Sequence, residues 1–125
     1  MNHIKRNPIL ILDFGSQYTQ LIGRRVREMG VYCEIYPFNV GLDEVEHLKP
    51  VGIILSGGPS TVTFDTNPRA PEWVFESKIP LLGICYGMQT MASQAGGCVT
   101  PHRAGEFGAT PIQIDSTSAL FQQVP

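Results

Sequence analysis

The chain has 125 residues, 42% hydrophobic content, nine basic and eleven acidic residues, and a formal net charge of −2. This length suits one compact globular domain, which buries roughly two-thirds of the surface of its unfolded chain. The near-neutral charge gives no basic footprint for nucleic acid or for an anionic membrane, so we expect a small molecule or another protein domain as the partner.

The first predicted unit is a buried strand followed by an amphipathic helix. Residues 9–12 are a continuous apolar run that ends in Asp13 and Gly15, which is typical of a buried strand and a turn. Apolar residues then recur at helical spacing from Tyr18 to Met29, and Gly30 is a stop signal.

The alternation of strands and helices continues along the chain as far as Gly97. The further strands are predicted at 31–36, 51–55 and 80–84, and the further helices at 42–48, 71–77 and 86–95. This alternation predicts an α/β fold with a mainly parallel sheet and helices on both faces. Beyond Gly97 the pattern is weaker, and residues 109–114 are a strand candidate. In such sheets ligands bind beyond the carboxyl ends of the strands.

Cysteine usage and apolar runs bear on the location of the protein. Residues 1–8 lack the apolar core of a signal peptide, and no run approaches the roughly 20 apolar residues of a membrane helix. The three cysteines, Cys33, Cys85 and Cys98, form no C-x-x-C pair of the kind that binds zinc. We therefore expect a cytoplasmic protein without a metal site in this chain.

One cysteine stands between two glycines where a predicted strand passes into a helix. The stretch Gly83-Ile-Cys-Tyr-Gly87 is the thiol counterpart of the nucleophile elbow G-x-S-x-G. A sharp turn strains its central residue, and the amides at a helix N-terminus favour the nucleophilic thiolate. Cys85 is therefore a candidate nucleophile, and the backbone N–H of Tyr86 is a candidate oxyanion donor. The alternative is a buried, apolar Cys85, and for Cys33 we predict a structural role, as for Cys98.

A glycine loop and a glutamine complete the candidate site. Ser56-Gly-Gly-Pro59 follows the third predicted strand, so it should lie at the same sheet edge as Cys85. Gly58 is a candidate for the second oxyanion donor, and Gly57 is a candidate substrate-binding residue. Gln89, one helical turn after Cys85, is another candidate substrate-binding residue. The alternatives are an ordinary turn for the loop and a solvated or helix-capping role for Gln89.

These motifs carry a resemblance to a known family. The elbow Gly83-Ile-Cys-Tyr-Gly-Met-Gln89 and the loop Ser56-Gly-Gly-Pro59 are similar to those of class I (triad) glutamine amidotransferases. The stretch Ile11-Leu-Asp-Phe-Gly-Ser-Gln-Tyr-Thr-Gln20 and the later Pro68-Arg-Ala-Pro71 resemble the GMP synthase family within that class. The resemblance covers nearly the whole chain and implies a flavodoxin-like fold, with residues 1–125 as the N-terminal portion of the amidotransferase domain.

The resemblance also implies a reaction and its partners. Cys85 would attack the side-chain amide of glutamine, the amides of Gly58 and Tyr86 would hold the oxyanion, and Gly57 and Gln89 would help position the substrate. Ammonia would leave, and water would hydrolyse the γ-glutamyl thioester. In the complete enzyme, expected as a homodimer, a synthetase domain would use ATP and Mg to convert XMP and ammonia into GMP. No cofactor is implied for this chain itself.

The sequence departs from the family at the remainder of the triad. The family's His-Pro-Glu segment and the synthetase loop Ser-Gly-Gly-Val-Asp-Ser are missing here, and His3, His47 and His102 are predicted to be solvated surface residues. We therefore expect a truncated piece of the enzyme that is inactive alone. Two alternatives stay open, namely a non-catalytic flavodoxin-like regulatory or interaction domain, and another cysteine hydrolase built on the same elbow.

Overall fold

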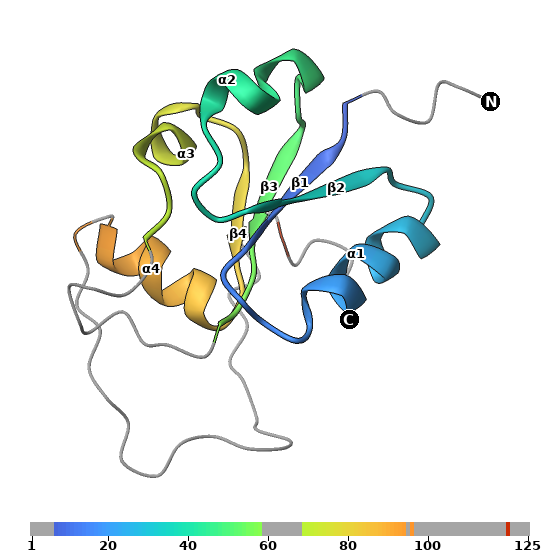
Figure 1. Cartoon of the computed structure of the whole chain (residues 1–125), viewed down its shortest axis with the longest axis horizontal. Coiled ribbons are helices and arrows are strands. Elements are labelled where there is room, and N and C mark those ends of the chain that lie inside the picture. The colour runs from blue at the N-terminus through green and yellow to red at the C-terminus, as the bar shows by residue number, and fades with distance from the viewer. Residues whose placement is uncertain (1–6, 59–68, 95, 97–119, 121–125) are drawn as a thin grey trace, which may run out of the picture.

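The computed structural model describes residues 7–58, 69–94, 96 and 120 (Figure 1). The strands are β1 (Ile9–Asp13), β2 (Cys33–Pro37), β3 (Gly52–Leu55) and β4 (Leu81–Gly83). The helices are α1 (Thr19–Glu28), α2 (Leu42–Val45), the short 3-10 helix η2 (Glu46–Leu48), α3 (Glu72–Glu76) and α4 (Tyr86–Gln94). Each of these elements lies where the sequence predicts one, and the strand candidate at 109–114 lies outside the described residues.

The strands of the described part form one parallel sheet in the order β2-β1-β3-β4. The central strand β1 pairs on both sides, so that Ile11 lies beside Ile35 of β2 and Ile54 of β3. The chain adds β2 on one side of β1 and then β3 on the other side. The direction of winding therefore reverses between β1 and β3, which makes their carboxyl ends a topological switch point, the usual place for a ligand in such sheets.

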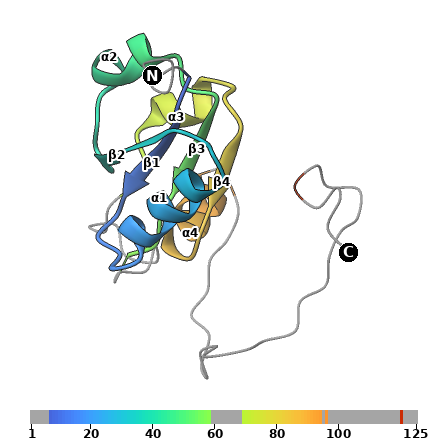
Figure 2. The same ribbon diagram turned by 90° about the vertical axis from the view of Figure 1, so that its right-hand side faces the viewer.

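Helices cover both faces of the sheet, as predicted. Helix α1 packs on one face, where Gly23 lies close against the side chains of Ile35 and Cys33. Helices α3 and α4 lie on the other side of the strands (Figures 1 and 2). Cys33 is buried and its thiol donates a hydrogen bond to the Gly23 carbonyl at 3.4 Å, in agreement with a structural role.

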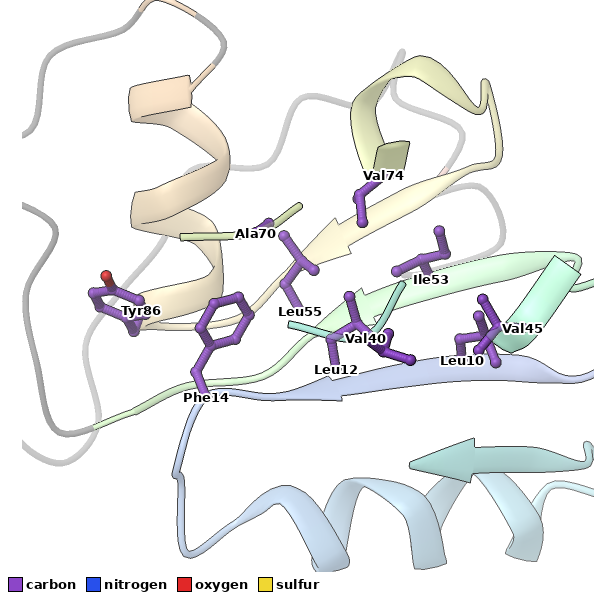
Figure 3. Packing of buried hydrophobic residues seen from close by; sticks show 10 residues of the cluster. All are labelled: Leu10, Leu12, Phe14, Val40, Val45, Ile53, Leu55, Ala70, Val74 and Tyr86. Carbon is purple, nitrogen blue, oxygen red and sulfur yellow. The ribbon is translucent and has the colours of Figure 1, made fainter. Parts of the chain in front are cut away.

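The main core lies between the sheet and helices α2, α3 and α4, which cover one face of the sheet. Alternate residues of β1 and β3 point into it because successive side chains of a strand face opposite sides. Figure 3 shows these side chains meeting residues from the helices and loops. The buried cluster comprises Leu10, Leu12, Phe14, Val40, Val45, Ile53, Leu55, Ala70, Val74 and Tyr86. Each large apolar side chain buried in this way contributes about 1.5–3 kcal/mol to folding.

Candidate active site

Cys85 occupies a strained turn between a strand and a helix. β4 ends at Gly83 and α4 begins at Tyr86, so only two residues connect them. The φ angle of Cys85 is +53°, in the left-handed region that side chains rarely adopt. A residue held there costs about 1–3 kcal/mol, which the surrounding structure must offset. The side chain of Cys85 is exposed, so the alternative of a buried cysteine is wrong.

Backbone contacts hold this elbow in place. The N–H of Ile84 donates to the Leu55 carbonyl at 2.9 Å, and the N–H of Gly87 donates to the Ile84 carbonyl at 2.9 Å. A Cβ added to Gly87 would lie 2.1 Å from the Leu55 carbonyl oxygen, so the start of α4 rests directly on the end of β3. A glycine is therefore required at position 87 for the two backbones to approach.

The glycine loop after β3 lies directly beside the elbow. A Cβ added to Gly57 would lie 3.1 Å from the Cβ of Cys85. A Cβ added to Gly58 would lie 2.4 Å from the carbonyl oxygen of Phe14, in the loop that follows β1. Residues 57 and 58 are thus fitted between the elbow and the β1 loop, as the shared sheet edge predicts.

A cleft of about 590 Å³ opens in front of Cys85, at the switch point between β1 and β3. Its lining residues are Gly15, Ser16, Gln17, Tyr18, Leu21, Ile22, Gly57, Gly58, Ile84 and Cys85. Three of the predicted site residues, Cys85, Gly57 and Gly58, therefore meet around one opening. The cleft is lined by the loops that follow β1, β3 and β4 and by the apolar residues Leu21 and Ile22 of α1. This composition suits a small ligand with a polar end.

The other two predicted site residues, Tyr86 and Gln89, both lie in α4. Tyr86 is 2% exposed, its ring packs in the core 5.5 Å from the ring of Phe14, and it is not among the residues that line the cleft. Gln89 is partly buried in α4, and its backbone N–H donates to the Cys85 carbonyl at 3.1 Å. Gln89 is not among the residues that line the cleft.

Helix α4 is also anchored at its far end, by contacts that the sequence does not predict. The side chain of Gln94 accepts a hydrogen bond from the Ala70 N–H at 3.0 Å and donates one to the Ala70 carbonyl at 2.8 Å. The neighbouring Arg69 donates to the Tyr86 hydroxyl at 3.1 Å. The segment before α3 is therefore attached to both ends of the helix that carries the elbow.

The described residues supply no histidine for the cleft. His47 lies in η2, which leads into the amino end of β3, whereas Cys85 follows the carboxyl end of β4. Figure 1 accordingly shows α2, directly before η2, at the opposite end of the sheet from the start of α4. His47 is exposed, as predicted. His3 and His102, like Cys98, lie outside the described residues.

The part of the chain that the structure describes has neither a metal cluster nor a membrane span. It contains no group of three or more His, Cys, Asp or Glu side chains placed to hold a metal ion. Within the same ranges, no helix is both long enough and apolar enough to cross a membrane.

Nearly the whole sequence matches one protein family. The model of the class-I glutamine amidotransferase family matches residues 10–125. The chain belongs to this family. A crystal structure of a Thermoplasma acidophilum protein, provisionally assigned as a GMP synthase subunit, resembles the amidotransferase fold described here with a TM-score of 0.77 and 28% identity. That match covers 96% of this chain and 60% of the other.

Curated relatives of this amidotransferase chain are named GMP synthase (glutamine-hydrolysing). It is 62% identical to the protein of Legionella pneumophila strain Lens, 56% to that of Mannheimia succiniciproducens and 55% to that of Shewanella frigidimarina. Each match covers 99% of this chain but 24% of the relative. The chain thus spans about a quarter of the length of these relatives.

Sequence reasoning missed one wall of the amidotransferase cleft. Residues 15–18 follow β1 and line the cleft beside Cys85. The sequence predicts a turn and the start of a helix in this stretch, and the stretch carries part of the family resemblance, but no site role is predicted for it. The available signal was its position, because a loop after a central parallel strand opens at the same edge as the loops after its neighbours.

Proposed function

We propose that this chain is the nucleophile-bearing, N-terminal portion of a glutamine amidotransferase domain that hydrolyses the side-chain amide of glutamine. One observation carries the proposal: the exposed, strained Cys85 lines a cleft together with the neighbouring Gly57 and Gly58. Strained backbone clusters at functional sites. Lys49 and Lys78 also have a positive φ, but Cys85 differs from them because it lines the cleft.

The proposed reaction begins with attack by the thiolate sulfur of Cys85 on the side-chain carbonyl carbon of glutamine. A C–S bond forms, and the carbonyl electron pair moves onto oxygen, where the N–H groups of Gly58 and Tyr86 are the proposed donors. When the carbonyl re-forms, the C–N bond breaks and the nitrogen takes up a proton and leaves as ammonia. Water then hydrolyses the thioester, which releases glutamate and restores the thiol.

Substrate positioning is assigned to Gly57 and Gln89 in this proposal. Gly57 borders Cys85 without a side chain, which leaves room for the substrate amide beside the sulfur. Gln89 lies one turn further along α4 and would hold a polar group of glutamine only where the substrate reaches past the lining of the cleft.

The whole protein's activity is a further part of the proposal. Relatives about four times as long as this chain are named GMP synthases, which supports ammonia transfer to a synthetase portion that uses ATP and Mg to convert XMP into GMP. The triad histidine and glutamate would come from the rest of the amidotransferase domain. We propose a homodimer for the complete enzyme and little or no glutamine turnover by the 125-residue chain alone.

Covalent labelling tests the function directly. The full-length protein is treated with 6-diazo-5-oxo-L-norleucine, a glutamine-shaped electrophile, and the modified residue is located by mass spectrometry. We expect modification of Cys85, protection by glutamine but not by asparagine, and no modification of the buried Cys33, which serves as an internal control. Cys85→Ser should abolish the label.

Two outcomes would replace the proposal with one of its alternatives. Labelling of Cys85 by ester or peptide electrophiles without protection by glutamine would indicate another cysteine hydrolase. A thiol that no acyl-type reagent modifies would indicate a non-catalytic domain. Separately, rapid release of ammonia from glutamine by the 125-residue chain would contradict its expected inactivity.

A further inference from the structure

Three polar side chains lie together beneath the cleft, and the proposed reaction does not use any of them. Ser56 is 0% exposed, Thr19 is 2% exposed, and Asp13 is partly buried. They come from the end of β3, the first residue of α1 and the last residue of β1. Burying three such groups costs free energy unless each finds a hydrogen-bond partner.

The three side chains form one connected hydrogen-bond chain. Thr19 Oγ1 donates to Asp13 Oδ1 at 3.0 Å and lies 3.1 Å from Ser56 Oγ. The backbone N–H of Gly15 donates to the same Asp13 oxygen at 2.8 Å, and the N–H of Phe14 donates to Ser56 Oγ at 3.2 Å. In the described ranges, no buried side-chain nitrogen or oxygen lacks a partner.

The carboxylate of Asp13 determines which group donates to which in this hydrogen-bond chain. An ionised carboxylate only accepts hydrogen bonds, so the single proton of Thr19 is committed to Asp13. Ser56 then gives its own proton to Thr19 Oγ1, which joins the two hydroxyls, and keeps a lone pair for the Phe14 N–H; the Gly57 carbonyl, 3.2 Å from Ser56 Oγ, is the competing acceptor. Each hydroxyl thus has a defined role, and a side chain of the same shape without the hydroxyl could not replace it.

This hydrogen-bond chain connects two walls of the cleft, because it joins Phe14 to Ser56, 42 residues further along the sequence. Ser56 directly precedes Gly57 and Gly58, and Thr19 directly follows the cleft-lining stretch 15–18. Gly58 rests on the Phe14 carbonyl, and the N–H of Phe14 is itself bound by Ser56. A change in the hydroxyl pair would therefore shift Gly58 relative to Cys85.

We propose that Thr19 and Ser56 are positioning residues that set the distance from the Gly58 amide to the carbon attacked by Cys85. This inference rests on the proposed glutamine hydrolysis. A positioning role predicts a specific pattern, in which turnover falls while substrate affinity, thiol reactivity and fold are kept.

The test compares variants of the full-length protein. Thr19→Val keeps the shape and removes the hydroxyl, Thr19→Ser restores the hydroxyl, and Ser56→Ala removes the other partner. Ser77→Ala is the matched control, because Ser77 also bonds a backbone carbonyl but lies at the end of α3, away from the cleft. Each variant is assayed for glutamine hydrolysis, for the rate at which iodoacetamide alkylates Cys85, and for its thermal midpoint.

We expect kcat to fall about tenfold or more in Thr19→Val and Ser56→Ala, short of the 10²–10³-fold loss when an oxyanion donor is removed outright. KM and the alkylation rate should stay within about threefold, because alkylation by iodoacetamide uses no oxyanion donor. Thr19→Ser should recover most of kcat. The double variant Thr19→Val/Ser56→Ala should lose little more than the worse single variant, since both act in one network.

Several results would overturn the inference. One is a kcat within about twofold of the wild type in both hydroxyl-deleted variants. Another is that Ser77→Ala loses as much kcat for each degree by which its thermal midpoint falls as the hydroxyl-deleted variants do. If Thr19→Val does not fold, Ser56→Ala and Thr19→Ser decide the matter by the same criteria. A full-length wild type that hydrolyses no glutamine would overturn the proposed function, and the positioning role with it.

Discussion

The interior of the sheet and its carboxyl edge are packed in different ways. In the interior, apolar side chains such as Leu10, Leu55 and Val74 fill the space between β1, β3 and the helices. At the edge, backbone meets backbone: Gly87 lies on the Leu55 carbonyl, and Gly58 lies on that of Phe14. The edge also contains the left-handed Cys85 and a buried pair of hydroxyls.

This difference determines what each region tolerates. Side chains in a core can adopt other rotamers, so exchanges that conserve volume cost less than about 1.5 kcal/mol. Two backbone segments in contact have no rotamers to adjust, so even one methyl group displaces an element. Substitutions in the interior should therefore change stability, whereas substitutions at the edge should change chemistry or destroy the local structure.

The largest effect is expected at Cys85 itself. In the full-length protein, Cys85→Ala and Cys85→Gly should both lower the rate of glutamine hydrolysis at least about 10⁴-fold, as removal of a nucleophile does. In stability their order should be unusual: the glycine variant should be the more stable by about 1 kcal/mol, because glycine adopts a positive φ without strain. Chemical denaturation of both variants measures this difference, and a more stable alanine variant would contradict the strain assigned to the elbow.

The next largest effect is expected at Gly87. Gly87→Ala should cost at least about 3 kcal/mol and abolish labelling of Cys85, because its methyl group would overlap the Leu55 carbonyl. Gly30→Ala is the control: its added Cβ meets nothing within 4 Å, and only the φ of +83° opposes it. That control should cost about 1 kcal/mol. Equal losses in urea unfolding would show that close approach is not the deciding factor.

A substitution in the interior should separate stability from chemistry. Leu10→Ala should lower the free energy of unfolding by about 2–5 kcal/mol through lost burial and a residual cavity. Leu10→Met, which conserves volume, should cost less than about 1.5 kcal/mol. In both variants the rate of Cys85 alkylation per folded molecule should equal that of the wild type. A slower alkylation of the folded fraction would mean that the core and the elbow are coupled.

The smallest effect is a pH response at Tyr32, Glu34 and Tyr36, which lie in or next to β2 and do not line the cleft. Tyr36 and Tyr32 donate hydrogen bonds of 2.7 Å and 2.8 Å to the carboxylate of Glu34. The hydrogen bond to Glu34, with burial second, raises the pKa of Tyr36 from 10.0 to about 12, and the same causes raise the pKa of Tyr32.

Because the folded-state pKa of Tyr36 is the higher one, its stabilising contribution is complete below pH 10 and is lost between pH 10 and about 12. Ultraviolet titration of the phenols should therefore show Tyr36 ionising well above pH 10. Glu34→Gln should move this ionisation towards pH 10. An unchanged titration in Glu34→Gln would contradict the assigned cause.

Local patterns were enough to predict the elements and the sharp turn at Cys85. The change from apolar runs to helical spacing locates β1 and α1, and the G-x-C-x-G stretch marks the turn at Cys85 before any contact is known. These features are encoded within a few neighbouring residues. They could be predicted because each depends on local sterics and periodicity.

The rest of the site depends on contacts between distant segments. Nothing near Thr19 indicates that its hydroxyl meets Ser56, 37 residues away, and nothing near Gln94 indicates that it binds Ala70. Such pairs follow from strand order and register, which periodicity does not specify. For the same reason the sequence does not specify how far Gln89 lies from the cleft, and its role with the substrate stays a prediction.

The strand order also has a consequence for biosynthesis. The ribosome releases β1, α1 and β2 first, and the sheet then extends on the other side of β1 through β3 to β4. A domain generally folds as a unit, and the elbow rests on the end of β3, so the elbow cannot form before β3, β4 and α4 have all left the exit tunnel. Until then Cys85 is an ordinary thiol in an extended nascent chain. The turn at Cys85 therefore depends on α4, which is the last of the described α-helices to emerge, and it forms together with the sheet on which it rests.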